Sequence, residues 1–67
     1  MEDKQKICDL LLPLLQATRA FHYLDDLEYI QDQDCVLLTF ASGYVRRVNV
    51  AMDSGIALIH DVIRTGL

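Results

Sequence analysis

Polar and apolar residues recur with helical spacing over residues 2–18. The apolar side chains of this stretch fill roughly 200° of a helical wheel, whereas a stripe of about 100° suffices to pack a helix on one layer. Pro13 falls among the polar residues, and an interior proline removes a hydrogen bond and crowds the preceding turn. The pattern predicts a helix over 2–18 that is kinked around Pro13. A helix that stops at Leu12, with a new turn beginning at the proline, is the alternative.

The following stretch is acidic, with five carboxylates between residues 25 and 34. Apolar and aromatic residues alternate with these acids, and residues 27–31 are predicted to form a short edge strand that ends in a turn at 31–34. Charges on an edge strand discourage pairing with other chains. Asp25 and Asp26, at the start of this acidic segment, are candidate polar contacts. The segment 25–34 either docks a basic partner or imitates DNA phosphates toward a DNA-binding protein, or it is simply exposed to water.

Residues 35–50 predict a β-hairpin, because two β-prone runs flank the turn Ala41-Ser42-Gly43 and glycine readily adopts positive φ. The adjacent residues Arg46 and Arg47 are expected to point to opposite faces of their strand. A β-ribbon can carry arginines into the DNA major groove, so these two are also candidate polar contacts. Pairing with the acidic strand, or exposure to water, is the other interpretation of these arginines.

The segment 53–65 predicts a second amphipathic helix, with Asp53 as its N-cap and Gly66 at its C-terminal end. The order helix, strand, hairpin, helix favours an α+β fold in two layers. We expect an N-terminal helix, a three-stranded antiparallel meander and a C-terminal helix, with both helices on one face of the sheet. Residues 1–67 are expected to form a single domain.

The chain has 67 residues, so its core is small, and a disulfide, a metal or a partner subunit would be expected to supplement it. Cys8 and Cys35 both lie in or beside apolar runs, which favours free thiols, although a bridge between them stays open. The cysteines and histidines lack the paired spacing of a zinc site. No catalytic, cofactor-binding or metal-binding residue is assigned, and no cofactor is expected.

Three further features of the sequence concern its setting. Residues 2–6 are polar and lead directly into the amphipathic segment, so no signal peptide is expected. No apolar run approaches the ~20 residues that cross a bilayer. The formal net charge of −4 argues against a protein that mainly grips nucleic-acid backbones or anionic membranes. A reducing cytoplasm is the expected location.

Apolar residues make up 52% of the chain, which is rich for so small a domain. Both the first helix and the hairpin carry more apolar surface than one two-layer monomer covers, and monomers rarely expose large apolar patches. A homodimer would cover this surface, with Leu12, Leu15, Leu37 and Val45 as candidate interface residues. A monomer in which residues 21–30 cover these side chains is the alternative.

The stretch 48–57, together with Lys4-Gln5-Lys6-Ile7 and Leu14-Leu15, resembles short uncharacterised proteins of Gram-positive gut bacteria and of their phages or mobile elements. This resemblance implies a bacterial, cytoplasmic setting and favours an accessory or regulatory role, and it implies no site residues. The sequence thus predicts a non-enzymatic interaction module that forms a homodimer and contacts an unidentified protein. A small nucleic-acid-associated regulator that uses Arg46 and Arg47 is the alternative.

Overall fold

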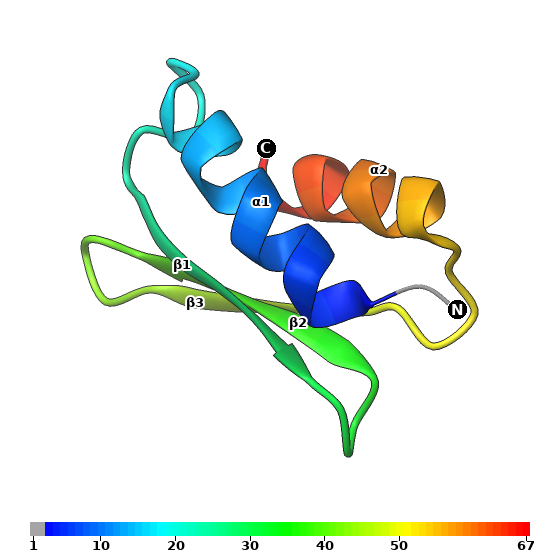
Figure 1. Cartoon of the computed structure of the whole chain (residues 1–67). Helices are drawn as coiled ribbons and strands as arrows, with labels where there is room; N and C mark the ends of the chain where they lie inside the picture. Colours follow the sequence, from blue (N-terminus) through cyan, green and yellow to red (C-terminus); the bar gives the residue numbers. More distant parts are fainter. Residues whose placement is uncertain (1–2) are drawn as a thin grey trace.

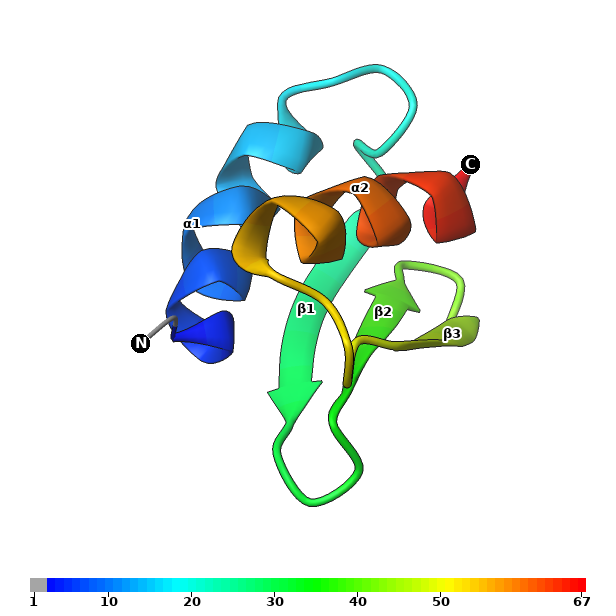
Figure 2. The same ribbon diagram turned by 90° about the vertical axis from the view of Figure 1, so that its right-hand side faces the viewer.

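The computed structural model describes residues 3–67 and has two layers, with a helical layer on one face of an antiparallel sheet (Figure 1). Five elements follow one another along the chain: α1 (Lys4–Gln16), β1 (Leu24–Ile30), β2 (Cys35–Phe40), β3 (Val45–Asn49) and α2 (Gly55–Gly66). The sheet is a meander in the order β1-β2-β3, and Figure 2 shows α1 and α2 together over the same side of it. The predicted α+β architecture is confirmed.

Helix α1 is capped by Asp3, whose carboxylate accepts a hydrogen bond from the backbone N–H of Lys6 at 3.0 Å. The cap satisfies one of the N–H groups that have no partner within the first helical turn. The part of the predicted helix at Glu2 lies outside the described residues.

Pro13 lies inside α1, and the helix continues past it to Gln16, so the alternative stop at Leu12 is wrong. The proline ring is on the exposed side of the helix. Proline lacks an N–H, so the helix loses one backbone hydrogen bond at this position, and the kink predicted around Pro13 stays a prediction.

Strand β1 begins earlier than predicted, at Leu24 instead of residue 27. The pairing register shifts between Leu24 and Asp26, which leaves Asp25 as an extra residue in the strand. Such a bulge is difficult to recognise from alternation, because it interrupts the period of two on which strand assignment depends. The hairpin agrees with its prediction, and Gly43 has a φ of 88° in the turn.

The core lies between the two layers. Helix α1 packs mainly on β1, and α2 packs on β2 and β3. The buried side chains of the core come from α1, β1, β2, α2 and the connecting segments, and β3 contributes the partly buried Val48. The buried residues are Cys8, Leu11, Leu15, Phe21, Leu24, Leu27, Val36, Leu38, Val50, Leu58 and Val62. No side chain in this cluster is charged, so the core is held together by apolar packing alone.

Helix α2 is capped by Ser54, and the prediction of Asp53 as the cap is wrong. The Ser54 hydroxyl accepts a hydrogen bond from the backbone N–H of Ala57 at 3.4 Å. The Asp53 carboxyl instead lies beside the carboxyl of Asp61 on α2. A hydrogen bond between these two side chains raises the Asp53 pKa. A serine directly after an aspartate offers two possible caps, and the backbone path into the helix decides between them.

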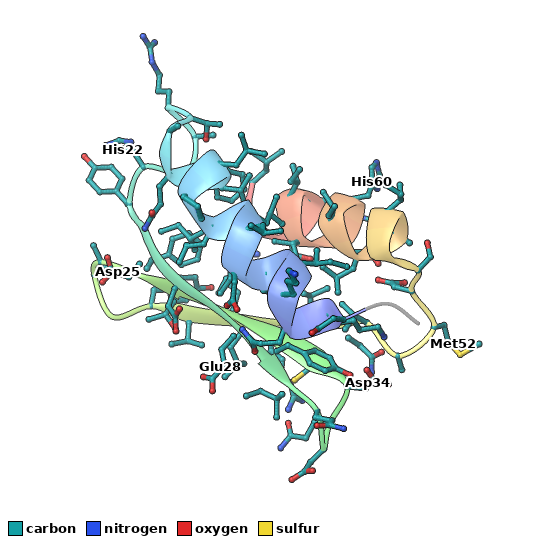
Figure 3. All side chains as sticks on the ribbon, in the orientation of Figure 1. His22, Asp25, Glu28, Asp34, Met52 and His60 are labelled. Atoms are coloured by element: carbon teal, nitrogen blue, oxygen red, sulfur yellow. The ribbon has the colours of Figure 1, made fainter. Side chains whose placement is uncertain are left out.

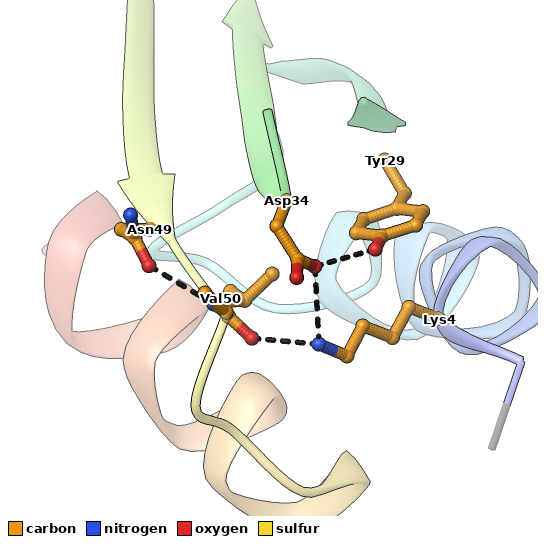
Figure 4. A network of polar contacts seen from close by, with 6 residues as sticks. Lys4, Tyr29, Asp34, Asn49 and Val50 are labelled. Atoms are coloured by element: carbon orange, nitrogen blue, oxygen red, sulfur yellow. Dashed lines mark hydrogen bonds and ion pairs between the residues drawn. The ribbon is translucent and has the colours of Figure 1, made fainter. Parts of the chain in front are cut away.

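A polar cluster around Asp34 joins three segments of the chain (Figure 4). The Asp34 carboxylate accepts hydrogen bonds from the Tyr29 hydroxyl at 2.5 Å and from Lys4 Nζ at 3.2 Å. Lys4 Nζ also donates to the backbone oxygen of Val50 at 2.7 Å, and the Val50 N–H donates to the Asp34 backbone oxygen at 3.0 Å. The cluster therefore ties the start of α1 and the end of β3 to the turn between β1 and β2.

Candidate functional site

The helical layer carries an apolar groove between α1 and α2 on its outer side. We call it the helical groove; it has a volume of about 230 Å³ and is lined by Ile7, Leu10, Leu11, Leu14 and Ile59. Leu10 is 66% exposed and Leu14 is 65% exposed. Ile56, one turn before Ile59 on α2, is 78% exposed and extends the apolar surface.

The opposite face of the sheet forms a second exposed surface, which we call the outer sheet face. No segment within residues 3–67 covers it in Figure 1. Leu37 lies between two fully buried neighbours of β2, so its side chain points away from the helices. Its register partners are Glu28 on β1 and Arg47 on β3, and the three side chains form one row across the sheet. In Figure 3, Glu28 lies on the side of the sheet away from the helices.

The four predicted interface residues do not share one surface. Leu37 and Val45 do lie on the outer sheet face, since Val45 pairs with Thr39 two residues from Leu37, and Val45 is 49% exposed. Leu15 is buried in the core at 5% exposure, so its assignment to an interface is wrong. Leu12 is half-buried and packs against the core from the helical layer. The helices cover the other face of the sheet, which separates Leu12 from Leu37.

A second hollow lies where the β2–β3 hairpin meets the end of α2. We call it the aromatic pocket; it has a volume of about 490 Å³ and is lined by Tyr23, Phe40, Ser42, Tyr44, Arg46 and Gly66. The Phe40 and Tyr44 rings are 6.2 Å apart, and the Arg46 guanidinium lies 5.5 Å from the centre of the Tyr44 ring. Tyr23 is 65% exposed. Sequence reasoning missed this pocket because its residues come from three separate parts of the chain.

Arg46 and Arg47 point to opposite faces, as predicted, and each has a partner within the chain. Arg46 Nη1 donates to the backbone oxygen of Thr65 at the end of α2 at 3.1 Å. On the outer sheet face, Arg47 Nη1 donates to the Gln33 side-chain oxygen at 2.9 Å. The two guanidinium groups therefore do not converge on one groove.

The predicted polar contacts Asp25 and Asp26 are both exposed at the start of β1. Asp26 pairs with Thr39 and so shares the outer sheet face with Glu28, whereas Asp25 is the extra residue of the bulge. Figure 3 shows Asp25 at the opposite end of the sheet from Asp34. The acidic segment is thus divided among several surfaces.

The side chains that could act as nucleophiles or hold a metal ion are the cysteines, histidines and acids. Burial, together with the nearby charges of Asp9 and Asp26, raises the pKa of the Cys8 thiol to about 11, so this thiol is protonated at neutral pH. Both cysteines are free and buried. Within residues 3–67, no group of three His, Cys, Asp or Glu side chains is arranged to hold a metal ion.

No protein-family model, curated protein or solved structure matches this chain. None of the helices in the described part of the chain has the length and apolar character that crossing a membrane would require.

Proposed function

We propose that this chain is a non-enzymatic interaction module that forms a homodimer and binds a protein partner. The observation that carries the proposal is the presence of exposed apolar side chains on two opposite faces of a two-layer molecule. The helical groove exposes Leu10 and Leu14, and the outer sheet face exposes Val45 beside Leu37.

A partner that buries either surface is stabilised there, because each Å² of apolar area removed from water contributes about 25 cal/mol to the free energy of association. A two-fold dimer uses the same patch on both copies, so it covers only one of two opposite faces. The other face stays available to a different protein. This arrangement suits an accessory or regulatory protein, whose role is to bring other molecules together.

The aromatic pocket offers few groups for proton transfer. Its lining includes no carboxylate, histidine or cysteine, and its ionisable side chains are Tyr23, Tyr44 and Arg46. The free, buried cysteines fit a reducing cytoplasm, and the bacterial setting follows from the resemblance described above.

The mass of the purified protein in solution tests the homodimer directly. We expect light scattering after size-exclusion chromatography, in the presence of reductant, to give a mass that rises from that of one chain to that of two over a concentration series. A monomer at every concentration up to the millimolar range would contradict the dimer.

Partner binding is tested with the double variant Leu10→Gln/Leu14→Gln, which keeps similar side-chain length and removes apolar area from the helical groove. The matched control is Lys6→Gln, which changes an exposed residue of the same helix. We expect a specific protein partner to lose affinity for the groove variant by about tenfold or more, because each Leu loses roughly 1 kcal/mol of apolar burial. Equal binding to both variants would contradict this role of the groove. Binding to a nonspecific DNA duplex at low salt that is lost in Arg46→Ala/Arg47→Ala would instead favour the nucleic-acid regulator.

A further inference from the structure

The outer sheet face carries opposite charges on its two edge strands. Asp26 and Glu28 belong to β1 at one edge, and Arg47 belongs to β3 at the other. Leu37 on the central strand separates Glu28 from Arg47 within one cross-strand row, and Val45 adds apolar area next to that row. Read across the sheet, the row is therefore acid, leucine, arginine.

Two orientations of the two-fold axis keep the strands of stacked copies aligned, and in only one of them is such a row complementary to a second copy of itself. If two sheets stack face to face about a two-fold axis parallel to the strands, β1 of one copy lies over β3 of the other. Glu28 then faces Arg47 of the other copy, twice, and Leu37 meets Leu37 at the centre. If the axis instead runs across the strands, Glu28 faces Glu28 and Arg47 faces Arg47, and like charges at an interface are strongly unfavourable.

We propose that a second copy of this chain docks on the outer sheet face about a two-fold axis parallel to β2, with Glu28 of each copy paired to Arg47 of the other. This inference rests on the homodimer of the proposed function and specifies its surface and orientation. Stacked sheets lie about 10 Å apart, a gap that a glutamate and an arginine side chain span together. The Gln33 contact uses one nitrogen of the Arg47 guanidinium and leaves its other donors free for a carboxylate.

The size of the face limits the strength of this dimer. Three strands spaced about 4.8 Å apart, with about five residues each at about 3.3 Å, cover roughly 14 by 17 Å. This is smaller than the ~800 Å² that each partner of a standard stable interface buries. The dimer is therefore expected to be concentration-dependent, with dissociation in the micromolar range or weaker, and its charges set orientation more than affinity.

Charge reversal tests the orientation. Glu28→Arg places arginines on both edges of the face, and Arg47→Glu places acids on both edges. We expect each variant alone to weaken self-association at least about tenfold in sedimentation velocity at low salt, because like charges then face one another twice. An equimolar mixture of the two variants should recover a dimer, and the double variant Glu28→Arg/Arg47→Glu should recover a homodimer.

The matched control is the groove variant Leu10→Gln/Leu14→Gln, which leaves the outer sheet face intact and should dimerise like the unmodified chain. Circular dichroism of each variant establishes that it is folded. A dimer that persists in Glu28→Arg, or a mixture that stays monomeric, would overturn this orientation. If the groove variant is monomeric while the charge variants remain dimeric, the interaction module stands and the sheet-face dimer is refuted. A monomeric unmodified chain refutes both the homodimer and its sheet-face orientation, and leaves partner binding to the groove variant to decide.

Discussion

Gly66, the last residue of α2, provides a sharp test of how the helical layer is packed. A Cβ at this position would lie 2.3 Å from Cε1 and 2.9 Å from Cζ of Phe21, and 3.2 Å from Cδ2 of Leu38. Phe21 is only 3% exposed and Leu38 is fully buried, so neither side chain can move into water to make room. The substitution Gly66→Ala therefore forces a shift of the Phe21 ring or of the end of α2.

The expected cost follows from two opposing effects. Overpacking a close-packed core typically costs about 1–3 kcal/mol. Alanine is favoured over glycine by about 1 kcal/mol inside a helix, but a terminal residue gains only part of this. We expect a net loss of about 1–2 kcal/mol in the free energy of unfolding. For a domain of this size, each kcal/mol lowers the midpoint of thermal unfolding by about 4–8 °C, so the midpoint should fall by roughly 5–15 °C.

Thermal and urea unfolding followed by circular dichroism measure this loss, at one fixed protein concentration because dimerisation also stabilises the fold. The control is Gly43→Ala, where a Cβ meets no atom within 4 Å but the φ of 88° strains any other residue by roughly 1–2 kcal/mol. The Gly66→Ala loss should be partly relieved by Phe21→Leu, whereas the Gly43→Ala loss should not. Gly66→Ala as stable as the unmodified chain, or fully additive with Phe21→Leu within about 0.5 kcal/mol, would refute the steric argument.

Three further predictions concern titratable groups. The hydrogen bonds from Tyr29 and Lys4 lower the Asp34 pKa below its ordinary 3.8. Ionised Asp34 therefore stabilises the fold above that pH, and this stabilisation is lost as the pH falls through the folded pKa. The variant Asp34→Asn, which suits the positive φ of this residue, should flatten the acid side of a plot of the urea midpoint against pH. The contact with Asp61 raises the Asp53 pKa above its ordinary 3.8. The stabilisation of the fold by protonated Asp53 is therefore present below pH 3.8 and is lost as the pH rises through the folded pKa. The variant Asp53→Asn should raise the urea midpoint at pH 7, and a lower midpoint would contradict this. Cys8, with its pKa of about 11, should react with a thiol reagent at pH 8 only at the rate of unfolding, and rapid labelling of the native protein would contradict its burial.

The sequence anticipated the elements whose signals are local. The hairpin was predictable because Gly43 supplies the positive φ and the flanking runs alternate around it. The early start of β1 was not, because the bulge at Asp25 places two residues opposite one and destroys the alternation. The wrong choice of Asp53 as the cap of α2 has another cause: Asp53 and Ser54 both have capping side chains, and only the backbone path decides between them.

The surfaces depend on contacts that no local pattern contains. An apolar arc of roughly 200° on α1 shows that some leucines must be exposed, but not which ones. The answer depends on the rotation of α1 over β1, which buries Leu15 and leaves Leu10 and Leu14 near the surface. On the hairpin, the strict alternation of a strand fixes the faces, and there Leu37 and Val45 were placed together correctly.

The distribution of the acids distinguishes between two interpretations of the acidic segment. Imitation of a phosphate backbone requires several carboxylates on one exposed surface. The structure instead commits the Asp34 carboxylate to Tyr29 and Lys4, places Asp26 and Glu28 on the outer sheet face, and leaves Asp25 as the extra residue of the bulge. On that face the acids lie opposite Arg47 across the sheet, so the surface has both signs of charge. A surface with both signs is a poor substitute for DNA, but it is well suited to meet a copy of itself.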